Sequence, residues 1–170
     1  MNKPETILSK IYTLPDLLKQ VNRWRFLGKT ISFTNGCFDL LHTGHIASLS
    51  QAASEGDFLI VGVNSDASVK RLKGNDRPIN NENSRALLLA SLAIVDAVIL
   101  FTEDTPLELV KAVMPDVMVK GGDYTVEQIE GAKEVIENGG RVVINPIVEG
   151  FSSTRIIEQI RTLNAGEKVM

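Results

Sequence analysis

The chain has two histidines, His42 and His45, and they stand three residues apart. Side chains at positions i and i+3 of a helix share one face, so a helix that begins here would turn both imidazoles into one crevice. Gly44, between them, removes a side chain where a ligand could approach the backbone. The unpaired N–H groups at a helix start also favour phosphate. This combination suits the stabilisation of negative charge on a phosphoryl oxygen.

Two other interpretations of the histidine pair have less support. Single histidines are often structural, but this spacing after a strand and a glycine turn favours function. A zinc site would need a third suitable ligand, and Cys37 is the only thiol in the chain. We therefore expect no metal site built from protein ligands.

The segment from Gly36 to His45 reads Gly-x-Phe-Asp-x-x-His-x-Gly-His. This pattern resembles the signature of the cytidylyltransferase-like nucleotidyltransferases. The resemblance implies that the chain joins a nucleoside monophosphate from a nucleoside triphosphate to a phosphorylated small molecule and releases pyrophosphate. The nucleotide contacts that it implies in this segment and at the residue before it are Asn35, Gly36, Phe38, Asp39, His42, Gly44 and His45.

The turn Ser152-Ser153-Thr154 opens the last expected helix and looks like the second signature of this superfamily. Its hydroxyls and N–H groups can bind the β- and γ-phosphates. Arg85 matches an arginine that contacts the nucleotide in similar enzymes. We also expect nucleotide contacts from Lys120 and Gly121, with Lys120 acting beside the histidine pair in catalysis.

The residues expected to bind the acceptor substrate come from two other loops. The segment 69–79 carries four cations, which beside a triphosphate pocket would offset the charge of the substrate and attract it. Lys73 and Arg77 are the preferred pocket residues among them. Asp123 could accept hydrogen bonds from sugar hydroxyls, with Tyr124 next to it.

The stretch from about Thr30 to Ile160 resembles more narrowly the adenylyltransferase domain of the bacterial ADP-heptose pathway. The segments that carry this resemblance are 73–79, 103–107, 115–124 and 152–154. It implies AMP transfer from ATP to D-glycero-β-D-manno-heptose 1-phosphate, for lipopolysaccharide core synthesis. It also implies Mg²⁺ bound mainly through the ATP phosphates, and a homodimer.

Two alternatives stay open at this point. One is a cytidylyltransferase that acts on glycerol 3-phosphate or a similar polyol phosphate. Relatives of that kind carry an arginine a few residues before the Ser/Thr turn, where this chain has Pro-Ile-Val-Glu at 146–149, so the sequence favours ATP. The other alternative is a non-catalytic nucleotide-binding domain.

Strand-like and helix-like segments alternate along the chain, which predicts an α/β, Rossmann-like parallel sheet with helices on both faces. The expected strands are 30–34, 58–63, 97–101, 116–119 and 141–145. The expected helices are 14–27, 43–55, 85–94, 105–113, 125–137 and 153–163. The candidate loops all follow strands, where ligands bind in such sheets. We predict an N-terminal helical extension over residues 1–29 and a nucleotidyltransferase domain over 30–170.

Composition restricts the class of partner. The formal net charge of −3 gives no bulk attraction to nucleic acid or to an anionic membrane. The longest apolar run, Ala86 to Leu100, is too short and too interrupted to span a bilayer. The single cysteine fits a reducing compartment, so we expect a cytoplasmic protein with no nucleic-acid or membrane partner.

Overall fold

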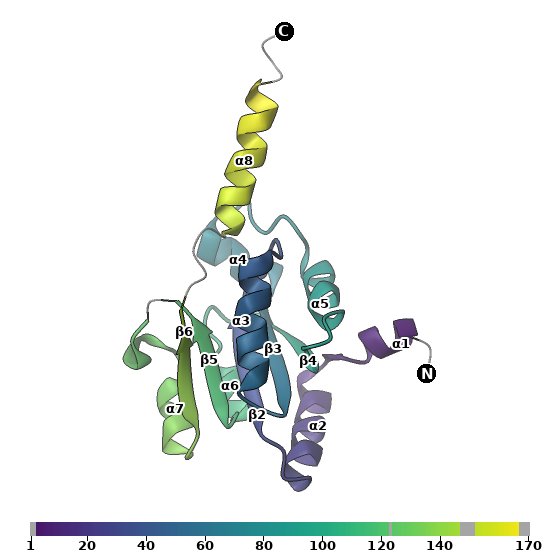
Figure 1. Cartoon of the computed structure of the whole chain (residues 1–170), viewed down its shortest axis with the longest axis vertical. Helices are drawn as coiled ribbons and strands as arrows, with labels where there is room; N and C mark the ends of the chain where they lie inside the picture. Colours follow the sequence, from purple (N-terminus) through teal and green to yellow (C-terminus); the bar gives the residue numbers. More distant parts are fainter. Residues whose placement is uncertain (1–2, 123, 147–151, 167–170) are drawn as a thin grey trace.

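The computed structural model describes residues 3–122, 124–146 and 152–166, and at its centre lies a parallel sheet of six strands (Figure 1). The strands are β1 (Ile11–Tyr12), β2 (Ile31–Gly36), β3 (Phe58–Asn64), β4 (Ala97–Phe101), β5 (Val117–Gly121) and β6 (Arg141–Asn145). Their order is β1-β4-β3-β2-β5-β6, and each neighbouring pair is parallel. The predicted α/β, Rossmann-like fold is confirmed.

Helices cover both faces of this sheet, because parallel strands are joined by crossovers that bury both faces. The helices are α1 (Lys3–Leu8), α2 (Leu14–Phe26), α3 (Thr43–Ser54), α4 (Asp66–Lys73), α5 (Glu82–Ala90), α6 (Leu107–Val113), α7 (Ala132–Glu137) and α8 (Ser153–Gly166), with one 3-10 turn, η1 (Val126–Gln128). Leu17 of α2, Val110 of α6 and Val135 of α7 pack with Phe33 on one face. Leu49 of α3 and Leu89 of α5 pack on the other face with alternate strand residues.

Residues 3–29 contribute to the same core as the rest of the described chain. Leu17, Val21 and Trp24 of α2 are buried, and Trp24 stacks on Phe58 of β3 with ring centroids 4.3 Å apart. The two-residue strand β1 adds an edge beside β4. Helix α2 therefore covers the sheet, one of the roles that its amphipathic pattern allows, while α1 and β1 were not expected.

Most predicted helices match the structure to within three residues at each end, while those expected at 85–94 and 125–137 differ in position or continuity. The helix expected at 85–94 begins at Glu82, because the side chain of Asn81 caps it by accepting from Ser84 N at 2.9 Å. The helix expected at 125–137 is divided into η1 and α7. Gly131 lies between them with φ of 92°, a left-handed conformation that interrupts a helix.

The order of the strands sets where a ligand can bind. Strands β2, β3 and β4 run to one side of the sheet, while β5 and β6 lie on the other side of β2. The order therefore reverses between β2 and β5, and ligands of such sheets bind beyond the carboxyl ends of the strands at that point. Helix α8 extends away from the sheet (Figure 1). None of the helices in the described ranges is long and apolar enough to cross a membrane.

Candidate active site

A cavity of about 700 Å³ lies at the carboxyl ends of the strands, beside the reversal in strand order. The structure brings most of the predicted site residues to its walls. Those that line it are Asn35, Gly36, Phe38, Asp39, His42, His45, Lys73, Arg77, Lys120, Gly121, Tyr124, Ser152, Ser153 and Thr154. Gly44 and Arg85 do not line it, and Asp123 lies outside the described residues.

The two histidines lie at the start of α3 with their rings stacked. His42 is the N-cap residue in an extended conformation, and the backbone N–H of His45 donates to His42 O at 2.9 Å. The ring centroids are 3.8 Å apart with 24° between the planes. The two imidazoles therefore face one crevice, as the sequence predicts.

Both imidazoles are held in the neutral form. Burial lowers the pKa of His42 below its ordinary value. Burial, together with the neighbouring His42, lowers the pKa of His45 to about 4. Two cations cannot share this stack without repulsion, so at neutral pH the pair offers N–H donors rather than positive charge.

The position of the proton on His45 follows from its surroundings. His45 Nδ1 is buried and has no hydrogen-bond partner among the described residues. A proton on Nδ1 would leave a buried donor unsatisfied, which is the costlier arrangement. We therefore assign the proton to Nε2, the nitrogen that is left to donate to a ligand in the cavity.

Two residues of the preceding loop support the histidine pair. The Phe38 ring lies 5.4 Å from the His45 ring at an angle of 58°. Phe38 has a φ of 48°, and its ring folds back over Gly36. A Cβ on Gly36 would come within 3.1 Å of that ring, so glycine lets Phe38 support the histidines.

Asp39 organises the loop that carries the predicted substrate cations. Its carboxylate accepts from Arg77 Nε at 2.6 Å, Ile79 N at 2.8 Å and Asn80 N at 2.9 Å. Burial acts to raise the pKa of Asp39, but these hydrogen bonds together bring it below the ordinary value. Asp39 and Arg77 therefore form a buried pair at the cavity wall, and Arg77 faces the cavity with its position fixed.

Arg85 has a different environment from the one expected of a nucleotide contact. Its side chain is fully buried, and its guanidinium donates to Asn80 O, to Cys37 O at 2.6 Å and to the Asp66 carboxylate at 2.8 Å. These bonds join β2–α3, α4 and α5. Its nucleotide contact stays a prediction, while the structure gives it the role of joining the loops around the cavity.

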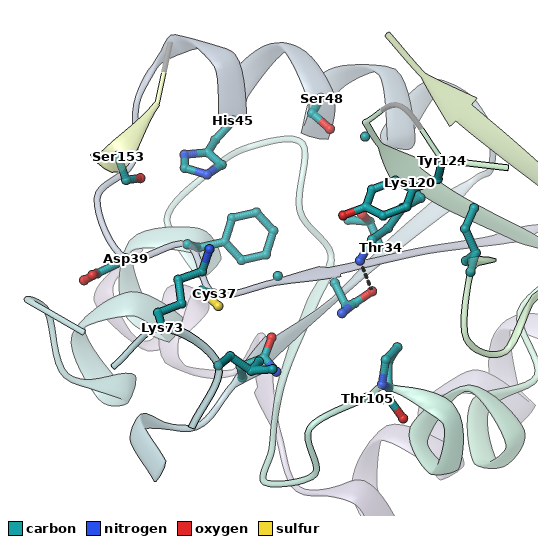
Figure 2. A pocket seen from close by; sticks show the side chains of 18 of the residues that line it. Thr34, Cys37, Asp39, His45, Ser48, Lys73, Thr105, Lys120, Tyr124 and Ser153 are labelled. Atoms are coloured by element: carbon teal, nitrogen blue, oxygen red, sulfur yellow. Dashed lines mark hydrogen bonds between the residues drawn. The ribbon is translucent and has the colours of Figure 1, made fainter. Parts of the chain in front are cut away.

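Lys120 and Asn35 lie on either side of the reversal in strand order, on β5 and β2. Lys120 Nζ donates to Asn35 Oδ1 at 3.2 Å, the dashed bond in Figure 2. Nζ also lies 6.0 Å from the centroid of the Tyr124 ring. Burial lowers the pKa of Lys120, and an anion bound in the cavity would favour its charged ammonium form.

The start of α8 lies beside the start of α3. Ser153 Oγ donates to Leu40 O, in the β2–α3 loop, at 3.1 Å. Figure 2 shows Ser153 and His45 near one another at the same end of the cavity. Ser152 and Thr154 also line this part of the cavity, so two helix starts and their hydroxyls are available to phosphate.

Several cavity residues were not expected from the sequence. They include Thr34, Cys37, Ser48, Asn64, Asp104, Thr105, Gln128 and Glu130. Asn64 ends β3 and begins a loop that the strand-end rule selects, and Thr105 follows β4, so the same rule extends to it. Ser48 lies one helical turn beyond His45, and its Oγ lies 3.1 Å from where a Cβ on Gly121 would be. Burial raises the pKa of the Cys37 thiol.

The chain matches known proteins over most of its length. A family model described as cytidylyltransferase-like matches residues 33–159. The chain belongs to the cytidylyltransferase-like family. This membership confirms the resemblance on which the nucleotidyltransferase prediction depends, since the match includes the β2–α3 loop and the start of α8.

Sequence relatives of this cytidylyltransferase-like chain are longer proteins. It is 57% identical over 151 residues to the bifunctional protein HldE of Koribacter versatilis, covering 89% of this chain and 31% of that protein. It is 53% identical over 152 residues to the bifunctional protein HldE of Rhodospirillum rubrum, with the same shares covered. The chain thus spans about a third of the length of these relatives.

Solved structures share the fold of this cytidylyltransferase-like chain. A lipopolysaccharide core biosynthesis protein from Thermoplasma volcanium superposes with a TM-score of 0.56 at 34% identity, covering 70% of this chain and 96% of that one. A pantoate-beta-alanine ligase from Francisella tularensis superposes with a TM-score of 0.52 at 17% identity, covering 76% of this chain and 64% of that one. The second likeness concerns the fold alone.

Proposed function

We propose that the chain transfers AMP from ATP to D-glycero-β-D-manno-heptose 1-phosphate, giving ADP-heptose and pyrophosphate. The observation that carries nucleotidyl transfer is the neutral, stacked His42 and His45 pair at the start of α3, facing a cavity of about 700 Å³. Neutral N–H donors and helix-start amides suit an α-phosphate whose negative charge grows during reaction.

The choice of substrate is supported by the relatives. Sequence identity of 53–57% to two HldE proteins covers most of this chain, and the relative from Thermoplasma volcanium is described as a lipopolysaccharide core biosynthesis protein. These agree with the resemblance to the adenylyltransferase domain of the ADP-heptose pathway. We therefore favour ATP and a heptose phosphate over CTP and glycerol 3-phosphate.

The reaction needs no base and no covalent intermediate on the protein. An oxygen of the sugar 1-phosphate attacks the α-phosphorus of ATP, the new O–P bond forms, and the bond to the β-phosphate oxygen breaks so that pyrophosphate leaves. Because the attacking oxygen is already anionic, the protein contributes alignment and charge stabilisation. We assign stabilisation of the α-phosphate to His42 and His45, with Lys120 beside them.

The remaining phosphates require positive charge and N–H donors. We assign the β- and γ-phosphates to the start of α8 with Ser152, Ser153 and Thr154, and we assign Lys73 and Arg77 to substrate phosphate. In the described part of the chain no group of three or more His, Cys, Asp or Glu side chains is arranged to hold a metal ion. A Mg²⁺ ion would then take most of its ligands from the triphosphate and neutralise its charge.

We also propose a homodimer, and a cytoplasmic enzyme with no nucleic-acid partner. The acidic net charge of −3 supports the last point. Light scattering coupled to size exclusion tests the dimer, with a mass of twice 18.6 kDa expected. A monomeric mass at micromolar concentration would contradict it.

A pyrophosphate-release assay over a grid of triphosphates and phosphorylated acceptors tests the proposed function. ATP with D-glycero-β-D-manno-heptose 1-phosphate is expected to give the highest kcat/KM, with ADP-heptose as the product. If CTP with glycerol 3-phosphate gave the highest kcat/KM instead, the proposal would be wrong and the cytidylyltransferase alternative would be supported. Turnover of no pair in the grid would support a non-catalytic nucleotide-binding domain.

A further inference from the structure

The cavity reaches both faces of the sheet at its carboxyl edge. His42 and His45 come from α3, whose Leu49 packs with Val61 and Val63 on one face. The other face of the sheet carries three polar residues of the cavity, because residues an even number of positions apart on a strand share a face. Asn35 follows Phe33 on β2, Asn64 follows Ile60 on β3, and Lys120 follows Met118 on β5. Phe33, Ile60 and Met118 all pack on that face. Thr105 and Gln128 come from elements that cover this second face, next to α6 and in η1.

The two sides of the cavity differ in chemistry. On the α3 side the walls carry imidazoles, the cations Lys73 and Arg77, and hydroxyls at a helix start. On the side of α6 and η1 they carry two amides, a hydroxyl and two carboxylates. These polar residues are Asn64, Asp104, Thr105, Gln128 and Glu130. Lys120 lies beside Asn35 where β2 and β5 meet, and the Asp104 carboxylate is already paired with Arg71 Nε at 2.6 Å. Phosphate fits the first side, whereas the second suits neutral hydroxyl groups.

Asn64 is the most buried polar residue on the second side, with 3% of its surface exposed. Its Nδ2 donates to Ser68 Oγ at 3.0 Å, and Ser68 Oγ donates to Glu103 O at 2.9 Å. A serine hydroxyl has one proton, so it can only accept from Asn64. This fixes which end of the amide faces Ser68.

The other end of the Asn64 amide is thereby left to the cavity. No described residue donates a hydrogen bond to Asn64 Oδ1. An oriented, nearly buried acceptor in a cavity wall favours a ligand that brings a hydroxyl donor, and disfavours one that leaves the acceptor unpaired. Figure 2 shows Thr105 at the end of this view away from Ser153 and Asp39, so the second side has a hydroxyl of its own.

We infer that the side of the cavity under α6 binds the hydroxyl groups of the acceptor, and that Asn64 is a specificity-determining residue there, with Thr105 as a second contact. This inference rests on the proposed function, because it assigns the polyol part of the same acceptor. The sugar ring would lie over the ends of β3 and β4, and its phosphate would reach across the edge of the sheet toward the histidines.

Steady-state kinetics of Asn64→Leu and Thr105→Val test this assignment, with the KM for ATP and the KM for heptose 1-phosphate measured separately. Loss of one hydroxyl partner is expected to raise the acceptor KM about tenfold in Asn64→Leu and severalfold in Thr105→Val. The KM for ATP should change less than about twofold, since uniform loss of acceptor binding leaves nucleotide binding intact. Ser153→Ala is the matched comparison, because it should raise the KM for ATP instead.

Thr105 is exposed, and valine has its shape, so the test survives if Asn64→Leu folds poorly. A folded Asn64→Leu with the acceptor KM of the wild type would overturn the inference, and so would equal increases in both KM values. Such results with an active wild-type enzyme leave the proposed function standing. A wild-type enzyme that turns over no sugar phosphate would instead defeat the proposed function, and this inference with it.

Discussion

At the scale of single residues, the site depends on side chains whose charge and direction are fixed by their neighbours. Burial lowers the pKa of both His42 and His45, and the neighbouring His42 lowers that of His45 further. Three donors favour the charged form of the Asp39 carboxylate. The imidazoles and the guanidinium of Arg77, which Asp39 holds in place, therefore line the same cavity. In the proposed reaction, this arrangement separates the groups assigned to the reacting phosphate from the group assigned to neutralise the substrate.

The His45 imidazole should make stability depend on pH below neutrality. Its pKa is about 4 in the folded protein and about 6.5 in an unfolded chain. The unfolded state then binds more protons between these values, so stability falls as pH falls from 6.5 toward 4. Because of this group, the free energy of unfolding in urea is expected to be about 1 kcal/mol lower at pH 5 than at pH 7. This value is half of the unscreened one, because the imidazole is partly exposed to solvent. In His45→Gln the difference should shrink, and an unchanged difference would contradict the neutral assignment.

The pairing of Asp39 with Arg77 should be visible in stability as well as in activity. Asp39→Asn removes the charge that Arg77 faces in a buried pair, with an expected loss of about 3 kcal/mol in the free energy of unfolding. The additional Arg77→Met change removes the unpaired guanidinium, so the double variant should recover about 1 kcal/mol or more in denaturant unfolding. A double variant whose losses simply add would show that the pair is not coupled.

At the scale of elements, helix α2 packs into the core in the same way as the helices that connect the strands. Trp24→Ala should cost about 3–5 kcal/mol, because the side chain is 5% exposed and stacks on Phe58. Phe26→Ala, two residues along the same helix and 90% exposed, should change stability by less than about 0.5 kcal/mol. Thermal or urea unfolding of the two variants makes the comparison. Equal effects would mean that α2 packs elsewhere.

The bounds of the helices and strands also show how much of the fold local sequence patterns predict. Parallel strands such as β3 and β4 are continuous apolar runs, and their predicted bounds agree closely with the structure. Helix α5 begins at Glu82 rather than Arg85, because the polar run 80–84 offers several capping residues and the side chain of Asn81 is the one that accepts from Ser84 N. The division between η1 and α7 depends on Gly131, where a Cβ would come within 2.9 Å of Val110. That contact comes from another helix, and no local pattern contains it.

At the scale of the whole molecule, the strand order brings loops far apart in sequence to one edge. The motif from Gly36 to His45 and the Ser152–Thr154 turn could be joined from the sequence because each follows a strand of one parallel sheet. The role of Arg85 could not, since a sequence does not show that its guanidinium meets Cys37 O, Asn80 O and Asp66. The direction of the Asn64 amide could not be predicted for a similar reason, because Ser68 and Glu103 set it.

Binding of the nucleotide should stabilise the whole molecule, because the cavity is lined by β2, α3, β5 and the start of α8 together. With Mg²⁺, ATP at about 100 times its Kd should add about 2.7 kcal/mol and raise the melting temperature by several degrees. CTP at equal concentration should give a smaller shift. A larger shift with CTP in differential scanning fluorimetry would contradict the preference for ATP.

The claim on which the account depends most is that the stacked imidazoles act on the α-phosphate. Its most direct test is pyrophosphate release by His45→Ala with ATP and heptose 1-phosphate, beside a melting curve and the KM for ATP. Loss of one donor to a developing oxyanion costs about 100-fold or more in kcat. We predict that loss in a variant that stays folded and keeps an ATP KM close to that of the wild type. A folded His45→Ala enzyme with kcat within about threefold of the wild type would contradict the account.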